Sequence, residues 1–301
     1  MRLPLPTKAP FSFAQTLAFV RRFPPCRDQT IITEDSLTAA VTVGGRPTAF
    51  TIRDGMVEVE RAVDAPALLA RAAHFVGARD DLGELYAAAE GDRHFRPLVE
   101  MLHGLHHVRF LTLEEIAVYS VMMQRNPMPR SAQMKRRLFE RIGLPVEVGG
   151  TTLYALPSID ELATLDGATY GEAIGHARKG EVIAEVVRGI ARIGESFLCE
   201  APYEKAKAEL LAIRGVGPFS AAAILLRGLG RMDEVPTAQI FEDEARALYG
   251  KAYDEAALRR RYGRQLGYWS FYLKTGVARL TARSVEGEDA PSSPRHRARR
   301  R

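Results

Sequence analysis

The stretch LLAIRGVGPFSAAAILL, residues 210–226, decides the fold of this chain. Apolar residues at helical spacing lead into Gly215-Val216-Gly217, and Pro218 follows where a second helix is expected to begin, since the first helical turn does not need the N–H that proline lacks. Two glycines permit a tight turn and the close approach of another molecule, while Val216 can face inward. These residues predict two helices joined by a glycine hairpin.

This hairpin has the chemistry of an anion site. Backbone N–H groups at the start of the second helix are free to bind a ligand, and the helix dipole favours negative charge there. Ser220 can add a hydroxyl donor. Such a site suits one DNA phosphate, held without reading the base sequence. The alternative is an ordinary pair of helices with a glycine turn. The small residues Ser220–Ala223, which allow close helix packing, favour DNA binding.

Composition narrows the class of protein. The chain has 301 residues, 46% of them hydrophobic and 26% charged, with a net charge of +5, which suits a globular protein with a nucleic-acid partner. No apolar run reaches the ~20 residues of a membrane span, and no secretory signal is evident, so we expect an intracellular protein. The two cysteines, Cys26 and Cys199, predict free thiols and exclude a four-cysteine metal site within this chain.

The first part of the chain predicts a small antiparallel sheet with helices on one face. Strand-like runs occupy residues 29–32, 37–43 and 47–52, and Gly44-Gly45 between the last two is typical of a two-residue hairpin. Alternation over 56–60 can add a strand. Helical spacing marks residues 11–22 and 65–76. We expect an α+β domain over residues 1–95.

The remainder predicts an all-α core over residues 96–283, followed by a disordered basic tail over 284–301 that ends in PRHRARRR. The tail either contacts phosphates loosely or is simply a solvated terminus. The expected helices of this part and just before it cover residues 81–90, 95–103, 112–123, 130–142, 158–164, 168–175, 178–197, 203–213, 218–229, 239–249, 254–265 and 268–282.

At the hairpin the chain resembles the helix-hairpin-helix DNA glycosylase superfamily, and it is most similar to the bacterial inducible 3-methyladenine type. The resemblance covers about residues 8–282 and extends to four further segments. They are Pro10-Phe11-Ser12-Phe13, Met122-Met123-Gln124, Leu156-Pro157-Ser158 with Asp160–Ala163, and Ile174–Lys179. The resemblance implies a small sheet domain followed by a helical glycosylase core.

The resemblance also implies an activity. Such enzymes flip a damaged nucleotide out of double-stranded DNA and cleave its N-glycosidic bond. Here the implied substrate is an alkylated purine, excised in base excision repair by a monomer that needs no cofactor or metal. The implied place of action is the bacterial cytoplasm, on the nucleoid. Relatives that also cut the strand carry a lysine where this chain has Phe219, which cannot form a Schiff base, so the resemblance implies base release without strand cleavage.

By position, the resemblance gives roles to several side chains. Arg125 is the candidate wedge that fills the gap left by the flipped base, and Gln124 is expected to line the site; both could instead be surface-loop residues. Phe219 and the pair Tyr268-Trp269 are expected in the base pocket, where aromatic faces attract a cationic base, or else in an aromatic core. Lys135, Arg136 and Arg137 either contact the DNA backbone or form a solvated helix face.

The chain departs from the family at the catalytic acid. The family places an aspartate at the start of the helix after the hairpin, where Thr237 or Ala238 stands here. The catalytic group is therefore unknown. The nearest substitutes are Glu242, Asp243 and Glu234. Without any of them, the protein would excise a base that is already poised to leave, or would be a catalytically silent protein that binds lesions.

The clustered histidines do not predict a metal site. His103 and His107 share a helix face beside His106, but only Glu100 lies near enough in sequence to add a ligand, so we expect packing roles and no metal site.

Overall fold

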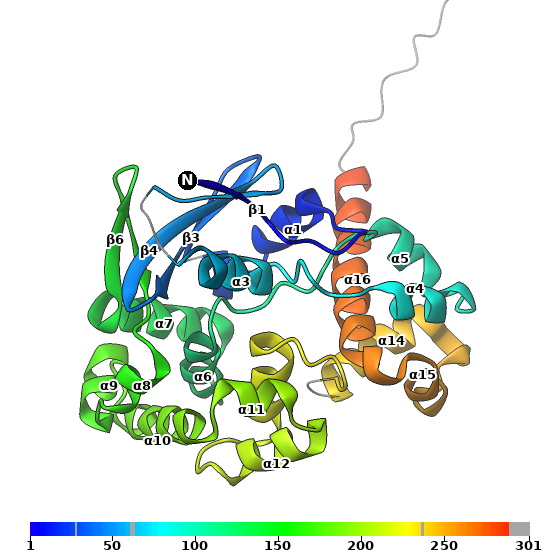
Figure 1. Cartoon of the computed structure of the whole chain (residues 1–301). Coiled ribbons are helices and arrows are strands. Elements are labelled where there is room, and N and C mark those ends of the chain that lie inside the picture. The colour runs from blue at the N-terminus through cyan, green and yellow to red at the C-terminus, as the bar shows by residue number, and fades with distance from the viewer. Residues whose placement is uncertain (28, 61–63, 236–237, 289–301) are drawn as a thin grey trace, which may run out of the picture.

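The computed structural model describes residues 1–27, 29–60, 64–235 and 238–288, and it has the expected α+β architecture (Figure 1). A five-stranded antiparallel sheet has the order β1-β5-β4-β3-β2. Its strands are β1 (Arg2–Pro4), β2 (Thr30–Ile32), β3 (Ser36–Val43), β4 (Arg46–Arg53) and β5 (Met56–Glu58). The sequence did not predict β1, because three residues are too few to show alternation.

The Gly44-Gly45 hairpin is confirmed. Val43 pairs with Arg46, and both glycines have positive φ, +57° and +72°, as a two-residue turn between antiparallel strands requires. Three helices share a hydrophobic core with this sheet: α1 (Phe13–Val20), α2 (Pro24–Arg27) and α3 (Ala65–Phe75). Asp64 caps α3 by accepting a hydrogen bond from the backbone N–H of Ala67.

A second core is helical. It contains α6 (Leu113–Met122), α7 (Met128–Ile142), α8 (Ile159–Ala163), α9 (Gly167–Ile174), α10 (Ala177–Ile193), α11 (Glu195–Glu200), α12 (Tyr203–Ala212) and α13 (Pro218–Ala223). The last of these continues without a break into a π-helical turn, η1 (Ile224–Gly228). Helix α10 is central to this group and packs on α6, α8 and α9.

A third core combines helices that precede the second core in sequence with helices that follow it. It contains α4 (Gly83–Glu90), α5 (Arg96–Met101), α14 (Ala238–Tyr249), α15 (Glu255–Tyr262) and α16 (Leu266–Glu288). Figure 1 shows α4 and α5 beside the long α16. A domain boundary at residue 95 stays a prediction, although α4, which precedes it, packs with this C-terminal group.

Two details differ from the sequence-based expectation. Helix α16 runs to Glu288, so residues 284–288, expected in the disordered tail, are helical; the tail from 289 to 301 lies outside the described residues. The region expected to be all-α contains a β-hairpin of β6 (Leu144–Val148) and β7 (Thr151–Ala155). Gly149-Gly150 forms its turn, and β6 and β7 pack on the sheet at β3 and β4. This Gly-Gly pair, flanked by alternating residues, was the signal that could have predicted the hairpin.

Within the described ranges, no helix combines the length and the apolar character that a membrane crossing demands.

Candidate nucleic-acid interface

The glycine hairpin between α12 and α13 is anchored from inside. Val216 is 7% exposed, which confirms that it faces inward, and its N–H donates to the carbonyl of Ile213 over 3.0 Å. Gly215 has φ +96°, and a Cβ there would lie 2.4 Å from Cγ1 of Val182 on α10. Gly215 is therefore required both by its backbone conformation and by its closeness to α10.

Gly217 differs from Gly215 because it faces open space. Its φ is −97°, and a Cβ at this position would have no atom within 4 Å among the described residues. Its carbonyl accepts the first intrahelical hydrogen bond of α13, from the N–H of Ala221 over 2.9 Å. The amides of Phe219 and Ser220 precede that bond, so they lie at the positively polarised start of the helix. This corner can accept an anion.

Ser220 does not offer its hydroxyl to this corner. The side chain is 2% exposed, accepts a hydrogen bond from Nε2 of Gln124 over 3.1 Å, and lies 3.5 Å from the carbonyl of Ser120. Its hydroxyl is thus used inside the protein, and only its backbone amide remains available for the contact that the sequence predicts.

The turn between α6 and α7 is joined to the hairpin. Nε2 of Gln124 donates to the carbonyl of Gly215 over 2.8 Å, and Nζ of Lys179 donates to the carbonyls of Val121 and Gln124 over 2.8 and 2.7 Å. Arg125 follows with an exposed side chain and φ +54°, at the tip of this turn. The structure therefore brings Gln124 and Arg125 to Gly215–Gly217. It uses Gln124 as a link rather than as a pocket lining.

The three aromatic residues predicted for a base pocket lie apart: Tyr268 lines one cavity and Trp269 another, and Phe219 lines neither of them. Phe219 is 36% exposed, whereas Tyr268 and Trp269 are 2% and 5% exposed in the third core. The hydroxyl of Tyr268 donates to the Asp80 carboxylate, and Nε1 of Trp269 donates to the hydroxyl of Tyr249 over 3.2 Å. Only Phe219 is left at the surface beside the hairpin.

Lys135 is buried rather than on the basic surface. Its side chain is 2% exposed, and Nζ donates to the Glu115 carboxylate and to the Pro25 carbonyl. The rings of Phe110, Tyr119 and Phe139 surround the ammonium with centroids 5.2 to 5.8 Å away. Among the predicted backbone contacts on α7, the solvated positions are Arg136 and Arg137.

A groove beside α7, on the side of Arg136, was not predicted from the sequence. It has a volume of about 910 Å³ and adjoins the Arg125 turn, since its lining begins two residues later. Apolar side chains form most of it, and Arg130 and Arg136 supply charge. Its lining residues are Pro24, Pro127, Met128, Pro129, Arg130, Ala132, Gln133 and Arg136. The three prolines were a visible signal, but only the fold brings Pro24 to α7.

The candidate acids near the start of α14 are mostly engaged. Glu242 accepts from Nε and Nη2 of Arg246 over 2.9 and 2.6 Å. Glu234 accepts from Nζ of Lys207 over 2.7 and 2.8 Å, which ties it to α12. Asp243 is exposed. Ala238 is the first residue of α14, and Thr237 lies outside the described residues.

The clustered histidines pack inside the protein. His103 stacks on Tyr86, and the ring of His106 bridges the carbonyls of Gly77 and Pro10, both at 2.7 Å. His107 is fully buried against aromatic rings of α16. Within the described parts of the chain, no group of three or more His, Cys, Asp or Glu residues could hold a metal ion.

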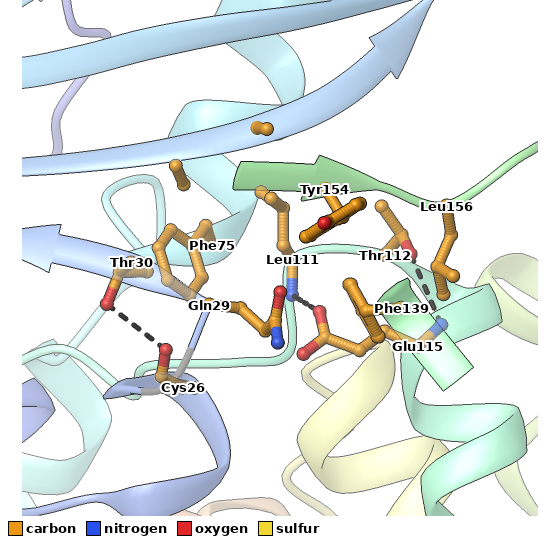
Figure 2. A pocket seen from close by; sticks show the side chains of 12 residues that line it. Cys26, Gln29, Thr30, Phe75, Leu111, Thr112, Glu115, Phe139, Tyr154 and Leu156 are labelled. Atoms are coloured by element: carbon orange, nitrogen blue, oxygen red, sulfur yellow. Dashed lines mark hydrogen bonds between the residues drawn. The ribbon is translucent and has the colours of Figure 1, made fainter. Parts of the chain in front are cut away.

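A small cavity lies where the sheet meets the helical core (Figure 2). Its volume is about 20 Å³, room for about one water and too little for a base. Glu115 is fixed there because it accepts from the N–H of Leu111 over 3.2 Å while its own N–H donates to Thr112 over 3.2 Å. Burial, together with Glu115, raises the pKa of Cys26 to about 12, so this thiol stays protonated and unreactive. We assign the cavity a structural role.

Similarity to known proteins agrees with this geometry, although no protein-family model matches the chain. It is 30% identical over 156 residues to a Mycobacterium tuberculosis protein named "Probable bifunctional transcriptional activator/DNA repair enzyme AlkA", covering 51% of this chain and 30% of that protein. It is 24% identical over 166 residues to the Bacillus subtilis DNA-3-methyladenine glycosylase, covering 54% of each. The chain thus matches less than two thirds of the length of these curated relatives.

Solved structures extend the match to nearly the whole fold. The 3-methyladenine DNA glycosylase of Archaeoglobus fulgidus superposes with a TM-score of 0.73 at 20% identity, over 91% of this chain and 97% of that one. The 8-oxoguanine glycosylase/lyase of Clostridium acetobutylicum superposes with a TM-score of 0.65 at 16% identity, over 87% and 92%. The chain thus has the fold of these DNA glycosylases, and about half of its sequence is similar to proteins named AlkA and DNA-3-methyladenine glycosylase.

Proposed function

We propose that this protein is a monofunctional DNA glycosylase that releases alkylated purines from double-stranded DNA in base excision repair. It would act as a monomer in the bacterial cytoplasm, on the nucleoid. One observation carries the proposal: the open amide corner at Gly217 is hydrogen bonded, through Gln124, to the turn that presents the exposed Arg125. Relatives named as repair glycosylases favour an active enzyme over a silent lesion-binding protein.

The glycine hairpin and the turn that carries Arg125 each have a role in binding DNA. The amides at the start of α13 hold one phosphate of the lesion strand, since they offer donors without steric hindrance at Gly217. Arg125, held at φ +54° on the tip of its turn, fills the space that the flipped nucleotide leaves. Because Gln124 fixes the two elements to each other, the wedge enters the duplex at a set distance from the gripped phosphate.

The reaction is hydrolysis. The bond between C1′ of the sugar and the base nitrogen breaks, its electron pair leaves with the base, and water adds to C1′ and gives up its proton to the departing base or to solvent. Phe219 has no amine, so no Schiff base forms and the strand stays intact. Ala238 at the start of α14 cannot stabilise the sugar cation. Either a substitute acid, such as the exposed Asp243, or stabilisation of the departing base would then carry more of the catalysis.

The test combines product analysis with a hairpin variant. Purified protein is incubated in excess over methylated duplex DNA, released bases are identified by mass spectrometry, and strand integrity is read on a denaturing gel. We expect free methylated purine and intact strands. Gly217→Asp should weaken duplex binding because it places negative charge at the phosphate, whereas Gly217→Ala should not, since its Cβ has room. Tight lesion binding without base release would instead identify a silent lesion-binding protein.

A further inference from the structure

Helix α10 contacts both elements of the proposed DNA-binding surface. Nζ of Lys179 donates to the carbonyl of Gln124 over 2.7 Å, which fixes the turn that presents Arg125 to the beginning of α10. Farther along the same helix, Cγ1 of Val182 lies 2.4 Å from the place where a Cβ on Gly215 would stand. The turn and the glycine hairpin therefore pack on α10 in a fixed order along its axis.

Two arginines meet at the N-terminal end of this helix. Helix α9 ends at Gly175, which has φ +70°, and His176 caps α10 by accepting a hydrogen bond at Nδ1 from the N–H of Lys179 over 3.3 Å. Nη1 of Arg137, from α7, lies 2.8 Å from the place where a Cβ on Gly175 would stand. Arg178 is exposed in the first turn of α10. We call Arg137 and Arg178, beside Gly175, the α10 basic cluster.

The protein does not neutralise the charge of this cluster. Arg137 and Arg178 are both exposed, and neither forms an ion pair with a carboxylate of the described residues; the same is true of Arg125 and Arg130. Glu181, the nearest acid in sequence on α10, lies instead against the start of α9. Exposed guanidinium groups without an acid partner are suited to bind phosphate oxygens. The cluster therefore extends the positive charge of the Arg125 turn along the surface.

The order of these elements along α10 determines which DNA strand each one meets. The hairpin packs at Val182, the Arg125 turn is held at Lys179, and the cluster lies at Gly175, on the other side of the turn from the hairpin. A helix rises 1.5 Å per residue, so the cluster lies roughly 10 Å from the hairpin contact, enough to cross a minor groove about 6 Å wide. A side chain that fills the gap of a flipped nucleotide stands between the two strands. With the hairpin on the lesion strand, the cluster therefore faces the complementary strand.

We propose that the α10 basic cluster binds the phosphate backbone of the undamaged strand, so that the protein contacts both strands of the duplex, one on each side of Arg125. This inference rests on the proposed glycosylase function and adds the complementary strand to what the protein binds. Phosphate contacts carry no base information, so the base opposite the lesion does not affect this contact. Contacts to both strands hold the duplex around the wedge while one nucleotide is out of the stack, which offsets part of the cost of unstacking.

The test places single neutral methylphosphonate linkages, one position at a time, in either strand of a duplex that carries an uncleavable tetrahydrofuran abasic-site analogue. Binding of the full-length protein is measured by fluorescence anisotropy. Wild type should lose affinity about three- to tenfold at linkages in the lesion strand and at a second group of linkages in the complementary strand. Arg178→Ala and Arg137→Ala should each lower the slope of log affinity against log salt by about 1. Each should also abolish the effect of at least one complementary-strand linkage and of no lesion-strand linkage.

Three variants serve as controls. Arg192→Ala removes an exposed arginine from the same helix, roughly 20 Å beyond Arg178, and should leave the sensitivity to both strands unchanged. Arg178→Lys keeps the charge and should keep the salt slope. Gly217→Asp should give the converse pattern, because it should abolish the effect of lesion-strand linkages and preserve that of complementary-strand linkages.

Two results would overturn the inference. One is a wild-type protein that is insensitive to every neutral linkage in the complementary strand. The other is full sensitivity to those linkages in both Arg178→Ala and Arg137→Ala. Release of methylated purines by wild type would leave the proposed function standing in either case. Equal affinity for abasic and intact duplexes, together with no base release, would count against the proposed function, and the linkage scan would still decide which strand the cluster contacts.

Discussion

Gln124 donates its side-chain amide to the backbone carbonyl of Gly215 over 2.8 Å, across 91 positions of sequence. A second bond, to the hydroxyl of Ser220 over 3.1 Å, keeps the same side chain on the hairpin. The residue after Gln124 is the exposed Arg125, so these bonds determine where the candidate wedge stands relative to the phosphate-binding corner. The proposed DNA-binding surface is thus one connected unit rather than two independent loops.

Gln124→Leu should uncouple the turn between α6 and α7 from the glycine hairpin. We expect lesion-duplex affinity to fall about tenfold and stability by about 1–2 kcal/mol, because two hydrogen bonds are lost and the Gly215 carbonyl loses its partner. Ser220→Ala is the control, since it removes the weaker bond and leaves the bond to Gly215. Fluorescence anisotropy and thermal unfolding measure the two effects. Equal losses of affinity in the two variants would show that the Gly215 bond does not position the wedge.

The two hairpin glycines should differ in how strongly substitution by alanine affects stability. Gly215→Ala should destabilise the protein by about 2–4 kcal/mol, because φ +96° is unfavourable for an L-residue and the new Cβ would meet Val182. Gly217→Ala should change the free energy of unfolding by less than about 0.5 kcal/mol, because φ is ordinary and the space is open. Chemical denaturation checks both; a stable Gly215→Ala variant would contradict the observed packing on α10.

The buried pair of Lys135 and Glu115 should behave as a structural unit. Lys135→Met should cost about 3–5 kcal/mol, because Glu115 would remain buried without its partner. Adding Glu115→Leu should restore most of that loss. A double-mutant cycle by urea unfolding measures the coupling. The double variant should keep the salt dependence of DNA binding, whereas Arg137→Ala should reduce it. A weaker salt dependence in the double variant would show that Lys135 contacts the DNA backbone.

Stability should fall at mildly acidic pH because of His74. Burial, with a smaller contribution from Arg109, lowers the pKa of His74 from 6.5 to about 3, and its Nε2 lies 2.7 Å from the carbonyl of Gly228. Between these two pH values the unfolded chain binds a proton that the folded chain does not. The free energy of unfolding therefore declines as pH falls below 6.5, by about 1.4 kcal/mol per pH unit from this group, until pH approaches 3.

Urea unfolding at pH 7.0, 6.0 and 5.0 measures this slope. His107, whose pKa is also lowered, adds to it in the same direction. In His74→Gln the amide can still donate to Gly228, but the titrating group is gone, so the slope should decrease by about one proton. An unchanged slope would mean that His74 is protonated in the folded protein.

Trp269 should matter for stability but not for base release. Trp269→Phe loses the hydrogen bond to Tyr249, which in turn donates to Asp92 over 2.7 Å. We expect a loss of about 1–2 kcal/mol in thermal unfolding and an unchanged rate of base release per folded molecule. Phe219→Ala is the comparison, since Phe219 is the aromatic residue left at the surface by the hairpin. Slowed release in Trp269→Phe would restore the sequence-based assignment of this residue to the base pocket.

Local spacing was sufficient for the features that depend on neighbours in sequence. The glycine hairpin with inward Val216, the Gly44-Gly45 turn, the α+β order and most helices follow from short-range rules of turn conformation and apolar periodicity. The lack of an amine at Phe219 and of an acid at Ala238 is likewise a matter of residue identity. For these features the sequence alone was decisive.

Only the tertiary structure decided which polar and aromatic side chains face the interior. Lys135 and Arg136 are neighbours on α7, yet one is buried against Glu115 and the other is exposed, because successive helical residues point about 100° apart and only packing selects the buried face. Tyr268 and Trp269 are buried for the same reason. Arg227, Phe23 and Phe271 are distant in sequence and meet only when three segments fold together, so no local pattern could have revealed this stack.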